Sequence, residues 1–149
     1  MKIRKAEKRD FGQYLILRKQ STKEYSKLFN EKINISDISI KNEFDEFSSS
    51  KKRFLLIAEK DNEVKGYLVG SLILSDYQKI GYIDDVFILK RFRKKGAGKK
   101  LIERFLKILE RNKIKKCRLG VSTKNNKAID IYKKMGFKIK HYEMEKKLK

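Results

Sequence analysis

The chain has 149 residues, of which 40% are hydrophobic and 40% are charged, and its formal net charge is +21. This composition indicates one folded, strongly basic domain over residues 1–149 and excludes a disordered chain. The charged start "MKIRKAEKRD" and the absence of a long apolar run predict neither a secretory signal nor a membrane span. One cysteine, Cys117, permits no internal disulfide, so we expect a cytoplasmic protein.

The first half of the chain predicts a strand, helices and a hairpin. A weakly alternating strand is expected at 2–7, and helical spacing over 10–30 with a break near Ser21. A short helix is expected around 42–47. Two apolar runs on either side of "KDNE" (60–63) predict an antiparallel hairpin.

The second half predicts the rest of a sheet. A strand at 79–89 leads into a helix that starts at Gly98, and "KKCRLGV" (115–121) alternates as a strand with Cys117 turned into the core. A helix in "NNKAIDIYKKMGF" (125–137) is expected to end at Gly136, and "FKIKHYEMEKKL" (137–148) to form one long strand or two short ones. This order predicts an α/β (α+β) fold with a mixed sheet.

The segment "RFRKKGAGKK" (91–100) combines glycine with positive charge between a strand and a helix. Free N–H groups and the positive end of the helix dipole meet there, which suits a phosphate. A Walker A loop is excluded, because Arg93 stands at its first glycine and Lys100 at its Ser/Thr. A dinucleotide fingerprint is excluded by Leu101.

The remaining pattern, Arg93-x-x-Gly96-x-Gly98, resembles motif A of the GCN5-related N-acetyltransferase (GNAT) family. "YIDDVFILKRFRKKGAGKKLI" is similar to the family's fourth strand and pyrophosphate loop, and "NNKAIDIYKKMGF" to its second motif. The terminal "YEMEKKL" is similar to its last strand. The resemblance implies a single-domain fold whose central, mostly antiparallel sheet is splayed at the acetyl-CoA site and flanked by helices. It covers nearly the whole chain and is strongest over 82–148.

The resemblance also implies how acetyl-CoA would be held as co-substrate, without a metal. The strand backbone at Val86, Phe87 and Ile88 would pair with the pantetheine arm, and the loop that begins at Arg93 would hold the pyrophosphate. Its backbone N–H groups are those of Lys94, Lys95, Gly96, Ala97, Gly98 and Lys99. At the second motif, Asn125 would hydrogen-bond the coenzyme, with Asn126 and Ala128 close by. The side chains of Lys95, Lys99 and Lys100 would suit its remaining phosphate.

Acetyl transfer to an amine needs a proton acceptor for the amine and a proton donor for the departing thiolate. By resemblance, Tyr132 is the donor facing the sulfur, and a strand N–H near Ile88 stabilises the oxyanion. Strand alternation places Asp84 and Asp85 on opposite faces. Relatives that resemble this strand often carry, at the position of Asp84, a Glu that engages the acceptor amine, so by resemblance we rank Asp84 above Asp85 as the acceptor. Three acidic residues in a region that borders the family's acceptor site predict an acidic mouth, shared with Asp84: Glu43, Asp45 and Glu46.

The expected function is transfer of an acetyl group from acetyl-CoA to a primary amine, either a small amine or polyamine or a peptide amine. The alternative acceptor is a protein N-terminus or lysine. Peptide-acetylating members often carry Glu where this chain has Gly120, which argues against that class. Monomer and homodimer both remain open.

Two alternatives belong to other classes: a basic nucleic-acid-binding module and a module that binds acyl-CoA without turnover. Residues 76–149 hold 24 Lys and Arg against 8 Asp and Glu, so nucleic acid or ribosome association is compatible with the charge. We do not favour it, because Phe92 alone supplies an aromatic ring among the basic residues of 91–100.

Overall fold

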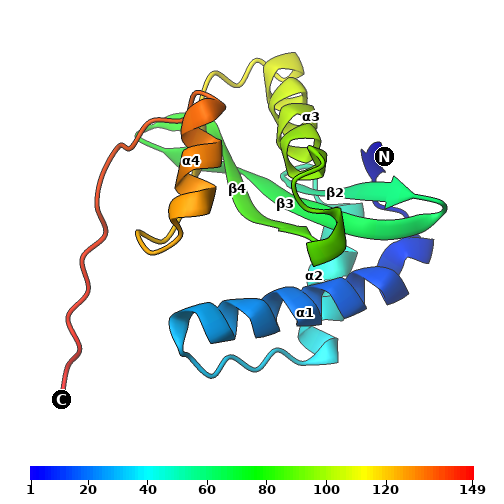
Figure 1. Cartoon of the computed structure of the whole chain (residues 1–149). Coiled ribbons are helices and arrows are strands. Elements are labelled where there is room, and N and C mark those ends of the chain that lie inside the picture. The colour runs from blue at the N-terminus through cyan, green and yellow to red at the C-terminus, as the bar shows by residue number, and fades with distance from the viewer. The chain divides into compact units, whose positions relative to one another are not determined.

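The computed structural model describes residues 1–149, which divide into two units, residues 1–119 and residues 120–149. The second unit contains one helix, α4 (Asn126–Lys134). One domain over residues 1–149 therefore stays a prediction. The elements of the first unit (Figure 1) are β1 (Lys2–Lys5), the 3-10 turn η1 (Lys8–Asp10), α1 (Phe11–Phe29), α2 (Asp37–Ser49), β2 (Arg53–Lys60), β3 (Glu63–Ser75), β4 (Gln78–Ile88), η2 (Lys90–Phe92), α3 (Ala97–Arg111) and β5 (Cys117–Leu119).

The five strands form one sheet in the order β1-β2-β3-β4-β5. The first four are antiparallel to their neighbours, and β5 runs parallel to β4. The predicted mixed, mostly antiparallel sheet is therefore confirmed, as is the hairpin, which turns at Asp61 and Asn62. No helix combines the length and the apolar composition that crossing a bilayer requires.

Helices cover both faces of this sheet. On one face lies a core cluster drawn from α1, α2, β2, β3 and β4, with Tyr14 and Ile40 fully buried. On the other face α3 packs closely: an added Cβ at Gly70 would lie 2.5 Å from the ring of Phe105, and one at Gly81 would overlap Leu109. The glycines of β3 and β4 thus let α3 lie against the sheet.

Two helices differ from their predicted extents. The first does not break near Ser21 but continues to Phe29, and within it the Thr22 hydroxyl donates to the Arg18 carbonyl at 3.0 Å. It ends at Asn30, whose φ of 52° is left-handed. The second is longer than 42–47, because the Ser36 side chain caps its start by accepting from the Ser39 N–H.

The prediction of a strand in residues 137–148 is wrong, because these residues form no regular element. Apolar alternation makes a strand only where a neighbouring strand supplies hydrogen bonds, and Ile139, Tyr142 and Met144 are all exposed. The strand predicted at 115–121 shrinks to the three residues of β5. Cys117 is half-buried there rather than in the core, and burial raises the pKa of its thiol to about 12, so it is no nucleophile at neutral pH.

Candidate active site

The site begins at a bulge in β4. Val69 of β3 lies opposite Asp85 while Gly70 lies opposite Ile83, so Asp84 is an extra residue in β4. Pairing with β5 covers Gly81 to Ile83 only, and β4 continues five residues further, to Ile88. The segment predicted to pair with a pantetheine arm, Val86 to Ile88, therefore lies where β4 has no partner strand on the β5 side.

The bulge overturns the prediction that Asp84 and Asp85 lie on opposite faces. The Ser71 hydroxyl donates to the Asp84 carboxylate at 2.8 Å, and the Tyr67 hydroxyl donates to the Asp85 carboxylate at 2.6 Å. Tyr67 and Ser71 are four residues apart on β3 and share one face of the sheet. Both carboxylates therefore lie on the face that α1 and α2 cover, because a bulge interrupts the alternation that we assumed.

Asp85 belongs to a network of buried and half-buried polar side chains. The Arg18 guanidinium lies 3.9 Å from its carboxylate and also donates to Glu43 at 3.2 Å. Tyr14 donates to the same Glu43 carboxylate from the other side. Tyr14 and Tyr67 are completely buried, and α1, α2, β3 and β4 each contribute to this chain of contacts. The network fixes the position of Asp85 relative to both helices.

The network also sets the electrostatics of Asp85. Burial is the largest influence and raises the pKa of the Asp85 carboxyl, and nearby Glu43 raises it further. The hydrogen bond from Tyr67 and the charge of Arg18 lower it, but the net pKa is raised. A carboxylate with a raised pKa is a stronger base than an exposed aspartate, so Asp85 suits proton acceptance.

The predicted acidic mouth forms only in part. Glu43 joins the network and lies near Asp85. Asp45 instead pairs with Lys41 at 2.5 Å and is largely exposed, and Glu46 is exposed as well. Because residues 43 and 45 lie on different sides of α2, only Glu43 faces the sheet. Asp84 is exposed and accepts a hydrogen bond from Ser71, and it forms no hydrogen bond with Glu43, Asp45 or Glu46.

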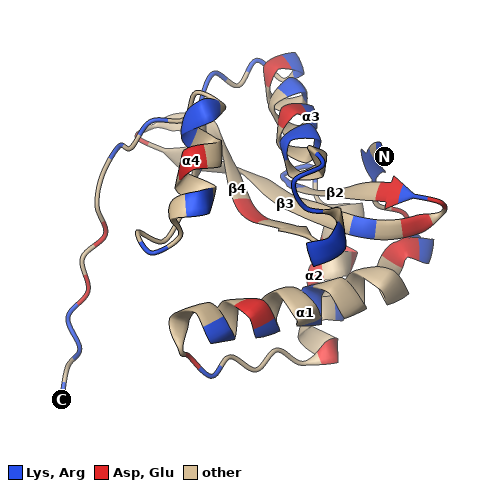
Figure 2. Ribbon diagram, viewed as in Figure 1, with Lys and Arg blue, Asp and Glu red and all other residues tan.

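The loop before α3 holds six consecutive N–H groups without an acceptor in the protein. They belong to residues 94–99, and the first helical bond of α3 runs from Lys100 N–H to the Gly96 carbonyl. No side chain caps this helix. Lys94 and Gly96 have left-handed φ values of 61° and 77°, which turn successive N–H groups into one concave surface. Figure 2 shows Lys and Arg along this loop and α3, so the site suits an anion.

The Arg93 side chain anchors the loop by contacts with β4 and α1. Its Nε donates to the Ile88 carbonyl at 2.7 Å, and its Nη2 donates to Glu24 of α1 at 2.6 Å. Its guanidinium also lies 5.4 Å from the Phe87 ring centroid. Arg93 therefore ties the loop to the open end of β4 and to α1.

The three lysines expected to hold the remaining phosphate have three different environments. Lys95 lies over the Phe92 ring at 5.7 Å, and Lys99 forms a long contact of 3.7 Å with Glu103 one turn along α3. Lys100 is exposed and forms no ion pair. All three side chains start in or beside the loop of free N–H groups, so their charges add to its attraction for an anion.

The second motif folds as the sequence predicts within its own unit. The Asn125 side chain caps α4 by accepting from the Ala128 N–H at 3.2 Å, and Asn126 is the first helical residue. Gly136 adopts a φ of 91° just after the helix, and the Phe137 N–H donates to the Tyr132 carbonyl. Tyr132 is half-buried and its ring meets that of Phe137 edge-on at 5.8 Å.

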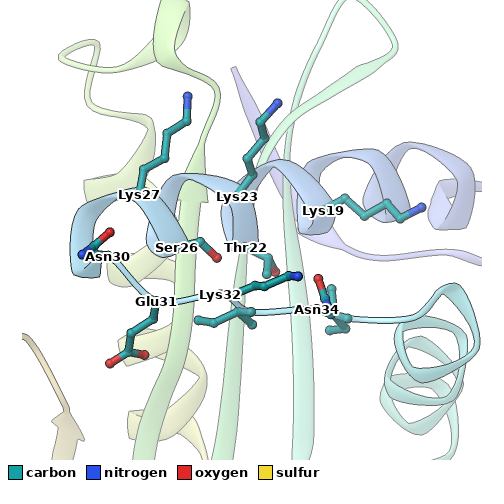
Figure 3. A pocket seen from close by; sticks show the side chains of 11 residues that line it. Lys19, Thr22, Lys23, Ser26, Lys27, Asn30, Glu31, Lys32 and Asn34 are labelled. Atoms are coloured by element: carbon teal, nitrogen blue, oxygen red, sulfur yellow. The ribbon is translucent and has the colours of Figure 1, made fainter.

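A hollow of about 680 Å³ lies elsewhere, between the C-terminal half of α1 and the segment that leads to α2 (Figure 3). Ser26 and Thr22 face this segment, whereas Lys23 and Lys27 extend away from it. The Ser26 hydroxyl is buried without a partner, but the Thr22 hydroxyl is already bound to Arg18. Neither Asp84 nor Asp85 lines this hollow, so we do not place the reaction there.

Sequence reasoning missed Arg18, Glu24 and Tyr67. Arg18 directly follows the buried Leu17, and Glu24 lies six residues further along α1, where it reaches Arg93 of the loop. A charged residue beside the apolar stripe of a helix was the available signal. The partner of Arg18 is Asp85, 67 residues away, and the partner of Glu24 is Arg93, 69 residues away. No local pattern in the sequence identifies such distant partners.

The sequence matches the family model described as the acetyltransferase (GNAT) family over residues 15–137. An N-alpha-acetyltransferase of Sulfurisphaera tokodaii is 30% identical over 99 residues, which are 58% of this chain and 59% of that protein. An uncharacterized N-acetyltransferase of Archaeoglobus fulgidus is 34% identical over 97 residues, 62% of this chain and 65% of that protein. The chain thus spans less than two thirds of either relative.

Solved structures share the fold at low sequence identity. The tetramutant of the BH1408 protein from Bacillus halodurans superposes with a TM-score of 0.85 at 21% identity, covering 99% of this chain and 100% of that one. Aminoglycoside N-acetyltransferase AAC(6')-Iy in complex with CoA gives 0.82 at 18% identity, covering 99% and 93%. These similarities establish the fold. Because the family model covers well over half of the sequence, the chain belongs to the acetyltransferase (GNAT) family.

Proposed function

We propose that the protein transfers the acetyl group of acetyl-CoA to a primary amine. The observation that carries this proposal is the run of six free N–H groups at residues 94–99, beside the open end of β4. A pyrophosphate would accept hydrogen bonds from these groups at the positive end of α3. The pantetheine arm would then run along Val86, Phe87 and Ile88 toward the bulge.

In this proposal each proton has a named carrier. The amine nitrogen attacks the thioester carbon, the N–C bond forms, and the C–S bond breaks. Asp85 takes the proton from the amine, and Tyr132 gives a proton to the departing sulfur. We now rank Asp85 above Asp84, because Asp85 has the raised pKa and the fixed position, whereas Asp84 is exposed. The Ile88 N–H remains the proposed oxyanion donor.

Asn125, Asn126 and Ala128 are proposed to contact the coenzyme. Because the Asn125 side-chain oxygen caps α4, its amide nitrogen is the group that it can offer to a ligand. Lys95, Lys99 and Lys100 would attract the remaining phosphate. The cytoplasmic location and the monomeric or homodimeric state also stay predictions from the sequence.

The proposed acceptor is a small amine or polyamine, or the amine of a flexible peptide. The relative from Sulfurisphaera tokodaii is an N-alpha-acetyltransferase, which supports a protein N-terminus as the second candidate. Glu43 next to Asp85 supplies negative charge for either kind of amine.

Thiol release from acetyl-CoA, measured across a panel of polyamines, small amines and peptides, tests the function. We expect release that depends on the amine, together with a rise in Tm on adding coenzyme A. Coenzyme binding without turnover on any amine would favour the non-catalytic acyl-CoA module. Stabilisation by the oligonucleotide and not by coenzyme A would overturn the proposal.

The pH dependence of turnover should carry the signature of Asp85. Below its pKa the Asp85 carboxyl is protonated and cannot accept a proton, so kcat should rise as pH increases through that pKa. Because burial raises this pKa, the midpoint should lie above the usual aspartate value of about 3.9. A pH profile of kcat at saturating acetyl-CoA and amine measures it.

Asparagine variants separate the two aspartates. In Asp85→Asn the rise of kcat with pH should disappear, and in Asp84→Asn it should remain. If the rise of kcat with pH remained in Asp85→Asn and disappeared in Asp84→Asn, Asp84 would be the proton acceptor. Equal acetyl-CoA KM values in both variants and wild type would show that coenzyme binding is intact.

A further inference from the structure

A second hollow, of about 570 Å³, lies among residues 5–112 and apart from the proposed coenzyme site. We call it the basic cleft. It is bordered by the end of β1, the segment joining α2 to β2, the start of β2 and the C-terminal half of α3. None of Asp84, Asp85 and residues 93–99 lines it. Its charged lining residues are Lys5, Lys51, Arg53, Arg104 and Arg111.

The basic cleft has five cationic side chains and no carboxylate in its lining. None of the five forms an ion pair, whereas Arg4, Arg18 and Arg93 each pair with an acidic side chain elsewhere in the fold. Like charges held together repel one another unless an anion neutralises them. The unpaired cluster therefore differs from the general basic surface of the chain.

Aromatic rings hold two of these cations. The Arg53 guanidinium lies 5.6 Å from the centre of the Phe47 ring, and Lys5 Nζ lies 5.9 Å from that of Phe54. Arg53 Nε is buried and donates to no acceptor in the protein. A buried donor without an acceptor is unfavourable, and an oxygen from a ligand would satisfy it.

Backbone carbonyls at the end of α3, which borders the cleft, accept hydrogen bonds within the protein. At the end of α3 the Ile108 and Leu109 carbonyls accept from Asn112, and Leu109 also accepts from the Ile114 N–H. The Asn112 side chain donates to Ile108 as well. The Ile108 and Leu109 carbonyls therefore already have partners within the protein.

We propose that the basic cleft binds an anion with two or more phosphate groups. Guanidinium groups donate paired hydrogen bonds to phosphate oxygens, and lysine adds charge without fixed geometry. A volume of about 570 Å³ falls within the range of small-molecule sites. The phosphates belong either to a free oligophosphate or nucleotide, or to a nucleic-acid backbone that passes through the cleft, and both present the same chemistry to these arginines.

Isothermal titration with inorganic triphosphate tests this site. We expect binding to the wild-type protein that weakens as salt is added. The double variant Arg53→Gln, Arg104→Gln should bind about tenfold or more weakly, because each lost charged hydrogen bond contributes to affinity. If the first variant folds poorly, the double variant Lys51→Gln, Arg111→Gln tests the same prediction, because both of its side chains are exposed at the edge of the cleft.

The control variant Lys115→Gln, Lys138→Gln removes the same charge outside the cleft and should bind like wild type. Equal binding by the cleft variants and wild type, or no binding at all, would overturn the proposal. So would loss of binding in Lys95→Gln, Lys99→Gln alone, because the triphosphate would then occupy the loop before α3.

A short single-stranded oligonucleotide, titrated in parallel, identifies the source of the phosphates. If the cleft variants weaken it as they weaken triphosphate, the cleft takes a nucleic-acid backbone. If triphosphate binds and the oligonucleotide does not, the ligand is a free oligophosphate or nucleotide. Both results support the cleft.

Discussion

Replacing Gly98 with valine should abolish coenzyme A binding while the protein stays folded. An added Cβ at Gly98 would meet only Ile88 Cγ1, at 3.8 Å, which is an ordinary contact, so the free protein can accept the side chain. The same side chain would stand where a pyrophosphate must approach the N–H groups of the loop. We expect affinity to fall roughly 100-fold or more, equivalent to about two charge-assisted hydrogen bonds.

Calorimetry with coenzyme A measures this loss, and thermal unfolding checks the fold. The matched control is Gly12→Val in the first turn of α1, where an added Cβ meets nothing within 4 Å. Both variants place a β-branched residue near the start of a helix, so we expect a similar small loss of folding stability in each. Unchanged affinity in Gly98→Val would remove the pyrophosphate assignment, whatever the control shows.

The loop before α3 could be predicted from sequence because its geometry is local. A strand (Gln78–Ile88), a left-handed glycine at Gly96 and an amphipathic helix (Ala97–Arg111) follow one another along the chain, and each has its own signal. The same holds for α4, where Asn125 and Gly136 mark the two ends. Both segments fold as expected.

The faces of Asp84 and Asp85 could not be predicted in this way. Alternation assumes an unbroken strand, but the bulge depends on how β4 pairs with Val69 and Gly70 of β3. The predicted faces of the two aspartates therefore rested on a geometry that only long-range pairing decides. The residues around Asp85, namely Arg18, Glu43 and Tyr67, come from three separate elements. The raised pKa of Asp85, which follows mainly from burial, depends on the same long-range packing.

The wrong strand at 137–148 has a related cause. The alternating pattern there describes which side chains share a face, but not whether another strand is present to bond the backbone. β5 has only three residues, all used against β4 on one side. Sequence patterns thus identified the elements that stabilise themselves locally and failed where hydrogen bonds must come from a distant segment.

Tyr132→Phe should lower turnover far more than it lowers acetyl-CoA affinity. The substitution removes only the hydroxyl, and the edge-on contact with Phe137 at 5.8 Å involves the ring that phenylalanine retains. Loss of a general acid typically reduces the rate by roughly 10²–10⁴-fold, so kcat should fall toward that range while the KM for acetyl-CoA stays near wild type. Single-turnover acetyl transfer at saturating acetyl-CoA measures the chemical step directly.

Tyr142→Phe is the matched control for this experiment, because Tyr142 is 77% exposed and lies outside every helix and strand. It should transfer acetyl groups at the wild-type rate. If Tyr132→Phe also kept the wild-type rate, another group or water would protonate the sulfur. A fall confined to the KM for acetyl-CoA would instead make the Tyr132 hydroxyl a coenzyme contact. Only a fall in the single-turnover rate with unchanged KM fits a hydroxyl whose role is to deliver a proton as the C–S bond breaks.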